Sequence, residues 1–210
     1  MGEQASDSQI YTDNVDSICE AESLGFHSVF LVEHHFTGFG QISATLNFLT
    51  YLAAKTSRMR LGTAVLVLPC HNPALLAERA ATLDLLSNGR LDLGIGKATG
   101  GFHGFCIPME EAGERYDEAM AFLRRAWTSK ARFSLHGKLW HFEDIVVAPA
   151  PVRKPHPPLW IGAFSPLRSA MRRRTTSTCY SAKMAVLSWW RRASAFIAKR
   201  WKHKTEPMIR

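Results

Sequence analysis

Apolar residues in the first 130 positions of the chain recur at two different spacings. Val15, Ile18, Cys19 and Leu24 fall at helical spacing. The segment 28–32 (SVFLV) is instead a short continuous apolar run, which is typical of a buried strand. The two patterns alternate and predict these elements: a helix capped by Thr12 or Asp13 and ended by Gly25, helices at 44–56, 73–87 and 110–128, and strands at 28–32, 59–69, 90–96 and 159–163.

This alternation of strands and helices determines the expected fold class. Long helices between strands connect parallel neighbours through right-handed crossovers, so we expect an α/β protein with a parallel sheet. Two segments depart from the pattern. Residues 132–147 predict two short strands around His136 and Gly137, and the proline-rich segment 148–158 predicts an extended linker before the last strand.

The positive charge of the chain is concentrated at one end. The net charge is +8, but residues 171–210 hold 11 of the 26 lysines and arginines and one of the 18 acidic residues. That segment therefore carries +10, whereas the first 170 residues carry −2. Since the body is mildly acidic, we expect no nucleic-acid partner and no membrane partner for it.

The change in composition also suggests a boundary in the chain. We divide it into a body at 10–169 and a basic tail at 170–210 that does not continue the strand–helix pattern. A tail of this kind is typical of a shifted reading frame or a foreign fusion. The alternative is that 183–204 forms a basic amphipathic helix for a membrane surface or a partner protein.

Cysteine usage and apolar runs indicate the compartment. The four cysteines form no CxxC pair and no framework spacing, so we expect free thiols in a reducing environment. The first residues lack the basic-then-apolar order of a secretory signal, and no run reaches the roughly 18 apolar residues of a membrane span. A cytoplasmic protein is the expectation.

Five motifs in order resemble the luciferase-like family, the flavin-dependent monooxygenases of the bacterial luciferase type, which are (β/α)8 barrels. The motifs lie within about 10–169 and are these: VFLVEHHF at 29–36, RLGTAVLVLP at 60–69, NGRLDLGIG at 88–96, GERY at 113–116 and PPLWIGA at 157–163. A complete barrel needs about 250 residues and eight strands. The chain offers four core strands, at 28–33, 59–68, 90–95 and 158–163. The resemblance therefore implies a partial (β/α)8 barrel that lacks the first strand and strands six to eight.

The resemblance also implies a reaction. Reduced flavin, usually FMN supplied by a separate flavin reductase, reacts with O2 and oxygenates a small organic substrate, an aldehyde in the luciferase case. Some relatives use a deazaflavin for hydride transfer instead, and the family commonly forms dimers. A non-catalytic flavin-binding protein or partner subunit of the same fold is the alternative.

Several residues match functional positions of the family. By resemblance, His34 is the catalytic acid or base, with Glu33 and His35 as orienting neighbours. Ala64 and Val65 match the place of a non-proline cis peptide bond under the flavin ring. The residues that match phosphate-binding positions are Lys97, Arg115 and Ser165.

The residues alone also allow plainer interpretations. A His–His pair after a strand is often a hydrogen-bonded loop feature, and Arg115 can pair on the helix face with Glu111 or Glu118. We expect no metal site, because no third ligand follows His34 and His35 at a metal spacing. Two positions depart from the family: Gly96 stands where luciferase has a reactive thiol, and Arg168 stands where the phosphate loop has a small hydroxyl residue.

Overall fold

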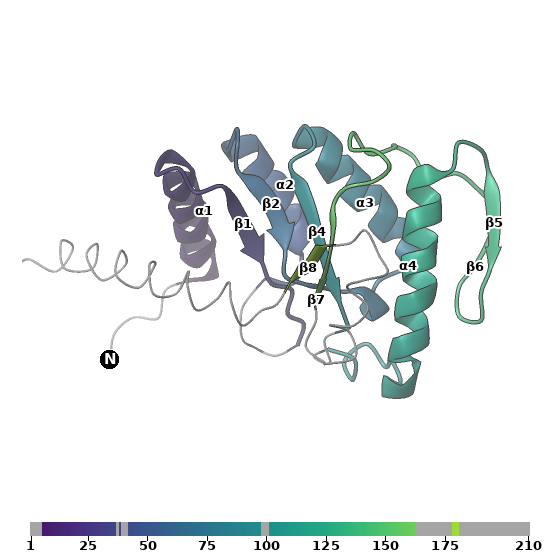
Figure 1. Cartoon of the computed structure of the whole chain (residues 1–210). Helices are drawn as coiled ribbons and strands as arrows, with labels where there is room; N and C mark the ends of the chain where they lie inside the picture. The colour runs from purple at the N-terminus through teal and green to yellow at the C-terminus, as the bar shows by residue number, and fades with distance from the viewer. Residues whose placement is uncertain (1–5, 37, 39–41, 98–100, 163–177, 181–210) are drawn as a thin grey trace, which may run out of the picture.

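A parallel sheet lies at the centre of the protein (Figure 1). The computed structural model describes residues 6–36, 38, 42–97, 101–162 and 178–180. The strands of the sheet are paired in the order β1-β2-β4-β7-β8, with β3 beside β4, and every pairing is parallel. The bounds are β1 Ser28–Leu31, β2 Arg60–Thr63, β3 Leu66–Val67, β4 Leu91–Gly96, β7 Leu159–Gly162 and β8 Thr178–Tyr180.

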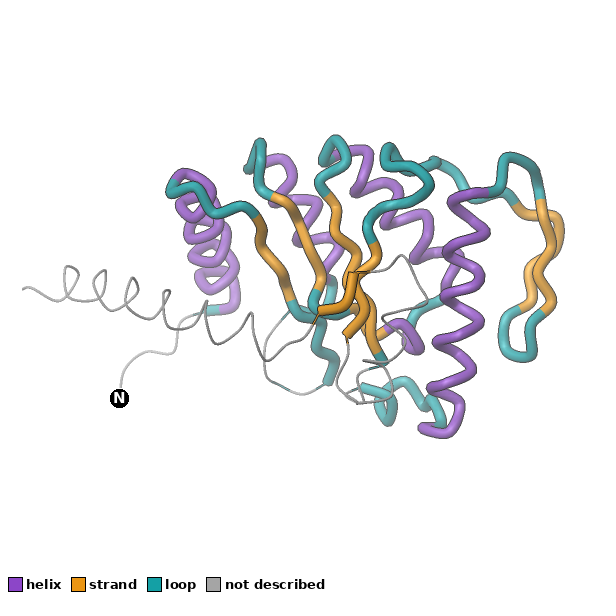
Figure 2. The backbone as a smooth tube through the Cα atoms, in the orientation of Figure 1, coloured by secondary structure: helices purple, strands orange, loops and turns teal. Residues whose placement is uncertain are grey.

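The helices follow the strands and cover one face of the sheet, as Figure 2 shows. Their bounds are α1 Asp7–Ser23, α2 Thr45–Lys55, α3 Pro73–Leu86 and α4 Ala112–Thr128, with short 3-10 helices η1 Leu68–Cys70 and η2 Met109–Glu111. Strands alternating with helices around a parallel sheet confirm the expected α/β class. Figure 2 also places a separate two-stranded hairpin on the far side of α4 from the sheet.

The two faces of the sheet differ in what they contact. Leu61, Leu91 and Leu93 are fully buried in one core together with the apolar faces of α2, α3 and α4. Alternate positions point to the opposite face, since successive side chains of a strand alternate. We call this face, which the described helices do not cover (Figure 2), the inward face. There the rings of Phe30 and Trp160 meet edge to face at 5.5 Å.

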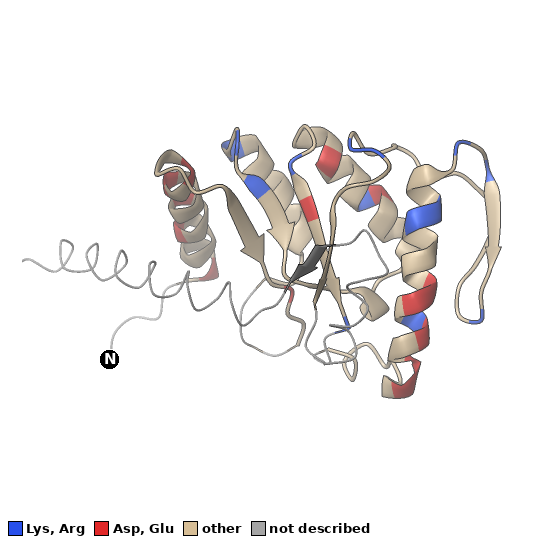
Figure 3. Ribbon diagram, in the orientation of Figure 1, with Lys and Arg blue, Asp and Glu red and all other residues tan. Residues whose placement is uncertain are grey.

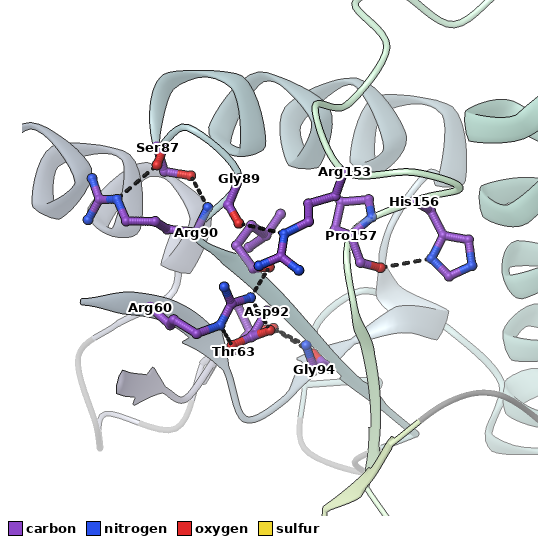
Figure 4. A network of polar contacts seen from close by, with 11 residues as sticks. Arg60, Thr63, Ser87, Gly89, Arg90, Asp92, Gly94, Arg153, His156 and Pro157 are labelled. Carbon is purple, nitrogen blue, oxygen red and sulfur yellow. Dashed lines mark hydrogen bonds and ion pairs between the residues drawn. The ribbon is translucent and has the colours of Figure 1, made fainter. Parts of the chain in front are cut away.

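A polar network crosses the inward face and the adjoining loops (Figure 4). Arg60 and Asp92 are the charged residues of β2 and β4, and their side chains form two hydrogen bonds of 2.6 Å. Thr63 Oγ1 accepts from Gly94 N–H at 2.8 Å and donates to the Gly94 carbonyl at 2.7 Å. Other charged residues lie mainly on helices and loops (Figure 3). The β2–β4 pairing is therefore fixed by side chains as well as by the backbone ladder.

The hairpin and the linker fall where the sequence predicts them. Strands β5 (Phe133–His136) and β6 (His141–Ile145) are antiparallel, and Phe142 packs on Phe122 of α4 with ring centroids 4.6 Å apart. The segment 148–158 is anchored to α3, because Arg153 N–H donates to Asp84 Oδ2 at 3.0 Å. It is thus a fixed connection between the hairpin and β7.

Three predicted features differ from the structure. The first helix begins at Asp7 with Ser6 as its N-cap, so the predicted cap at Thr12 or Asp13 is wrong. The predicted strand 59–69 is divided into β2, β3 and η1, and the peptide bond between Ala64 and Val65, which separates β2 from β3, is cis. The expectation that the tail at 170–210 does not continue the strand–helix pattern is wrong at one place, because Thr178–Tyr180 pair with β7.

Strand β8 has only three residues, too few to produce a periodic pattern. It forms because the edge of β7 has backbone groups available for pairing, with Trp160 opposite Thr178. The rest of the predicted tail at 170–210 lies outside the described residues. Its division from the body therefore stays a prediction.

The N-terminus of α3 gives a first test of local stability. Asn72 is its N-cap, and its Oδ1 accepts the N–H groups of Ala74 and Leu75 at 3.0 and 3.2 Å. Asn72→Ala leaves both donors without this partner and should lower the free energy of unfolding by about 1 kcal/mol. Urea denaturation measures it. Ala44→Ser is the matched control, since the Ala44 N-cap of α2 makes no side-chain bond and a serine should stabilise the protein; equal effects of the two changes would contradict this explanation.

Candidate functional site

The loops that follow β1, β3 and β4 meet at the carboxyl edge of the sheet. The strands are parallel, so their carboxyl ends lie at the same edge, which is where barrel enzymes place their sites. The loop after β1 carries Glu33, His34 and His35, the β3 strand leads through η1 to His71, and β4 ends at Gly96 and is followed by Lys97.

A buried carboxylate lies at the centre of this edge. The Glu33 side chain is 2% exposed, and its Oε2 accepts the N–H of Val67 at 2.8 Å. His71 Nε2 lies 3.1 and 2.9 Å from the two carboxylate oxygens, and His35 Nε2 lies 3.6 Å from Oε2. We call Glu33, His35 and His71 the Glu33 cluster.

The charge state of Glu33 follows from these contacts. Burial is the largest single influence and raises the pKa of Glu33. The hydrogen bond and charge of His71, the Val67 N–H and the charge of His35 together outweigh it and hold the pKa below its ordinary value. Glu33 is therefore an ionised carboxylate at neutral pH.

The two neighbouring histidines have different surroundings. The His35 ring lies 5.0 Å from the ring of Phe105, edge to face, and 6.0 Å from that of Phe36. His35 Nε2 is buried and has no hydrogen-bond partner among the described residues. His34 is half-buried, and its N–H donates to the Ile42 carbonyl at 2.9 Å, which fixes the backbone of the loop. The acid–base role of His34 stays a prediction.

The cis bond between Ala64 and Val65 is present, as the resemblance implies. The Val65 side chain lies against Gly96, where a Cβ atom would come within 2.6 Å of Val65 Cγ2. Position 96 therefore has no room for the cysteine of luciferase unless Val65 moves. That departure from the family has a packing reason.

The two described cations of the predicted phosphate site lie at the start of α4. Lys97 Nζ is 5.5 Å from the ring centroid of Tyr116. Arg115 binds Glu111 through Nε and Nη2, both at 2.9 Å, and its guanidinium carbon is 5.9 Å from the ring centroid of Trp140. The plainer interpretation of Arg115 as a helix-face partner of Glu111 is thus confirmed.

The other predicted contacts of this region have different outcomes. Glu118 does not pair with Arg115 in the hydrogen bonds and ion pairs of the described chain. Its carboxylate accepts the N–H groups of Lys138, Leu139 and Trp140 in the β5–β6 loop. Ser165 and Arg168 lie outside the described residues, so phosphate binding by Lys97, Arg115 and Ser165 stays a prediction.

The charges of Glu33 and Arg115 both act on the thiol of Cys70. Burial, the largest influence, and the Glu33 carboxylate raise the pKa of the Cys70 thiol to about 11, although the Arg115 charge lowers it. The thiol therefore stays protonated at neutral pH and is a weak nucleophile.

His71 is the site residue that the sequence prediction missed. The earlier expectation of no metal site relied on the lack of a third ligand near His34 and His35 in the sequence. In the fold, the side chain of His71, 38 residues after Glu33, lies beside Glu33 and His35. The available signal was the place of His71, directly after a predicted strand and before the Asn72–Pro73 helix start.

Comparison with known proteins decides the family. The sequence model of the family described as luciferase-like monooxygenase matches residues 2–199. The chain belongs to this family. The match begins before and ends after the 10–169 segment that holds the sequence motifs. In the described part of this luciferase-like chain, no helix is long and apolar enough to cross a membrane.

Individual relatives agree with this assignment. The oxygenase component of the flavin-dependent trigonelline monooxygenase of Acinetobacter baylyi is 32% identical over 79% of this chain and 47% of its own length. The crystal structure of monooxygenase RslO1 from Streptomyces bottropensis is 32% identical with a TM-score of 0.75, over 80% of this chain and 51% of that one.

A third likeness concerns the fold alone. The oxygenating constituent of 3,6-diketocamphane monooxygenase from Pseudomonas putida, solved with FMN, has a TM-score of 0.73 at 21% identity, over 85% of this chain and 55% of its own. The luciferase-like chain thus spans about half the length of the relatives it matches.

Proposed function

We propose that this luciferase-like chain forms part of a monooxygenase that uses reduced FMN and O2 to oxygenate a small organic, aldehyde-like substrate. The observation that carries the proposal is the convergence at one sheet edge of the His34 loop, the cis Ala64–Val65 bond and Lys97. The corresponding architecture is a partial (β/α)8 barrel in which these loops line one end.

The residues at this edge fit the two chemical parts of FMN. Gly96 is buried against the side chain of Val65, which is itself only partly buried, so an apolar side chain is available to an aromatic ring. Lys97 and Arg115 supply the cations that a phosphate needs. Arg115 uses Nε and Nη2 for Glu111, so an anion would be bound by its remaining Nη1 or in place of Glu111. Bound reduced flavin would supply the electrons that activate O2.

The chain itself would handle protons and position the ring. His34 lies in the loop whose backbone is fixed by Ile42, and an imidazole can give or accept a proton near neutral pH. The Glu33 carboxylate holds the same loop to the N–H of Val67, two residues after the cis bond. These contacts would therefore hold His34 at a fixed position relative to Val65 during the reaction.

The relatives also suggest what the protein works with. The trigonelline relative is named an oxygenase component, so we propose a separate flavin reductase as the source of reduced FMN here. The alternative cofactor is a deazaflavin in place of FMN. The same proposal includes a dimeric assembly and a cytoplasmic location. A non-catalytic flavin-binding or partner-subunit role is the outcome that the next experiment would reveal.

Titration with FMN and reduced FMN, followed by flavin fluorescence and absorbance, tests the proposal. We expect saturable binding, weakened at least about tenfold in Lys97→Ala and Arg115→Ala because each removes a charge-assisted contact to phosphate. Arg132→Ala is the matched control, since Arg132 forms an exposed ion pair with Asp144 on the hairpin. His34→Ala should bind FMN normally and lose about 10²- to 10⁴-fold in turnover with reduced FMN and an aldehyde.

Two results would overturn parts of this proposal. Absence of flavin binding by the unmodified chain removes the function altogether. Flavin binding with no turnover in both the unmodified chain and His34→Ala, or with equal turnover in the two, favours the non-catalytic role.

A further inference from the structure

The Glu33 cluster brings together three metal-ligating side chains, and the proposed flavin chemistry gives no role to His35 and His71. Glu33 Oε, His35 Nε2 and His71 Nε2 all lie within 4.8 Å of one another. Two of the side chains come from the loop after β1 and one from the residue after η1. Among the described residues this is the group of His, Cys, Asp and Glu side chains with the spacing of a metal site.

The separations suit an ion at the centre of the group. His71 Nε2 is 2.9 Å and His35 Nε2 is 3.6 Å from the same oxygen of Glu33. Ligand atoms at about 2.0–2.1 Å from a tetrahedral Zn²⁺ lie about 3.3 Å from each other. The two nitrogen–oxygen distances fall on either side of this value, and the two histidine ligand atoms also lie within 4.8 Å of each other.

His35 contributes an independent observation. Its Nε2 is buried and has no hydrogen-bond partner among the described residues, although it faces Glu33 Oε2. Buried polar atoms are ordinarily satisfied, so a nitrogen in this state indicates an absent partner. Phe105 packs edge to face against the ring and restricts its rotation.

The surroundings of the cluster also match those of metal sites. The Val67 N–H fixes the Glu33 carboxylate from behind, as outer hydrogen bonds do for metal-binding carboxylates. The side chains of His35 and His71 are 14% and 18% exposed. Two of the three side chains are therefore partly exposed, whereas Glu33 is buried.

We propose that Glu33, His35 and His71 form a binding site for one divalent transition-metal ion, with Zn²⁺ as the preferred ion. Two imidazoles and one carboxylate with an open fourth position are a donor set that zinc accepts. Each imidazole would bind the ion through an Nε2 that carries no proton, so the other ring nitrogen, Nδ1, would carry the N–H of each neutral ring. The occupied site ties the loop after β1 to the start of α3 without any flavin.

The experiment is a calorimetric titration of the metal-stripped chain with Zn²⁺, in the absence of flavin. We expect one ion per chain at the Glu33 cluster and a loss of affinity of about 100-fold or more in His71→Gln. That substitution keeps an amide N–H that can reach Glu33, so the fold is preserved while a metal ligand is removed. Circular dichroism verifies the fold, and the absorption spectrum of Co²⁺ in the same site reports the coordination number.

A matched control comes from the hairpin. His136 and Glu143 form an exposed His–Glu pair at 3.4 Å with no third ligand in the described chain. His136→Ala should therefore bind Zn²⁺ as the unmodified chain does. Equal Zn²⁺ affinity in the unmodified chain and folded His71→Gln overturns the proposal, as does a loss confined to His136→Ala. Absence of Zn²⁺ binding also overturns it and leaves the cluster as a proton-bridged one, whatever the flavin titration gives.

Discussion

Gly94→Ala is expected to destabilise the protein by more than about 3 kcal/mol, enough to leave much of the chain unfolded. Gly94 lies in the middle of β4, and a Cβ atom there would come within 1.8 Å of the Thr63 carbonyl oxygen. That oxygen belongs to the backbone of β2 and cannot turn aside like the end of a side chain. Strands β2 and β4 would have to separate, which also breaks both Thr63 Oγ1 hydrogen bonds to Gly94.

Circular dichroism and urea denaturation measure this effect, and Gly113→Ala is the matched control. Gly113 lies in the first turn of α4, and the nearest atom to its added Cβ is Lys97 Nζ at 3.3 Å, the end of a flexible side chain. Alanine favours a helix over glycine by up to about 1 kcal/mol, so this variant should be as stable as the parent or more so. Gly94→Ala with normal stability would show that the β2–β4 pairing is not as close as described.

The helices and strands could be predicted where buried apolar residues recur at a regular spacing along the sequence. Helix α3 begins at Pro73 as predicted, and β4 and β7 lie within their predicted ranges, since each is bounded by strong turn or cap residues. The start of α1 could not be placed in the same way. Its first turns have no buried residues, so the pattern begins only at the partly buried Tyr11 and Val15.

The break between β2 and β3 shows a second limit of sequence patterns. Residues 59–69 are mainly apolar and contain no proline before Pro69, so no strong turn signal divides them at Ala64 and Val65. The division at Ala64 and Val65 is a backbone feature, and the cis bond was expected only from the family motif. A resemblance can thus carry information that hydrophobic periodicity does not contain.

The candidate site was predictable only in part, for a related reason. His34 and Lys97 were placed at one edge because each follows a strand of a parallel sheet. The hydrogen bond between Glu33 and His71 depends on which loops become neighbours in the fold. No local sequence pattern predicts it. The partner of Arg115 could be predicted, because Glu111 lies four residues before it on the same helix face and the two side chains form an ion pair.

Removing one member of the Arg60–Asp92 pair should cost about 3–5 kcal/mol. The Asp92 side chain is 4% exposed and that of Arg60 17%, and the two groups are joined by two hydrogen bonds of 2.6 Å. Hydrogen bonding to Asp92 is the main reason that the pKa of Arg60 is raised, so the guanidinium stays charged. Asp92→Leu therefore leaves a largely buried cation without its carboxylate, and Arg60→Met leaves a buried anion.

The double variant with Arg60→Met and Asp92→Leu should be more stable than either single variant, because it removes both charges and keeps apolar side chains of similar volume. Urea denaturation of all four proteins gives the coupling free energy of the pair. Arg132→Ala is the surface control: its ion pair with Asp144 is 59% and 72% exposed, and its loss should cost less than about 1 kcal/mol. A double variant as unstable as the sum of the two singles would mean that the inward face of β2 and β4 requires each side chain separately, and that the charges there do not act as a pair.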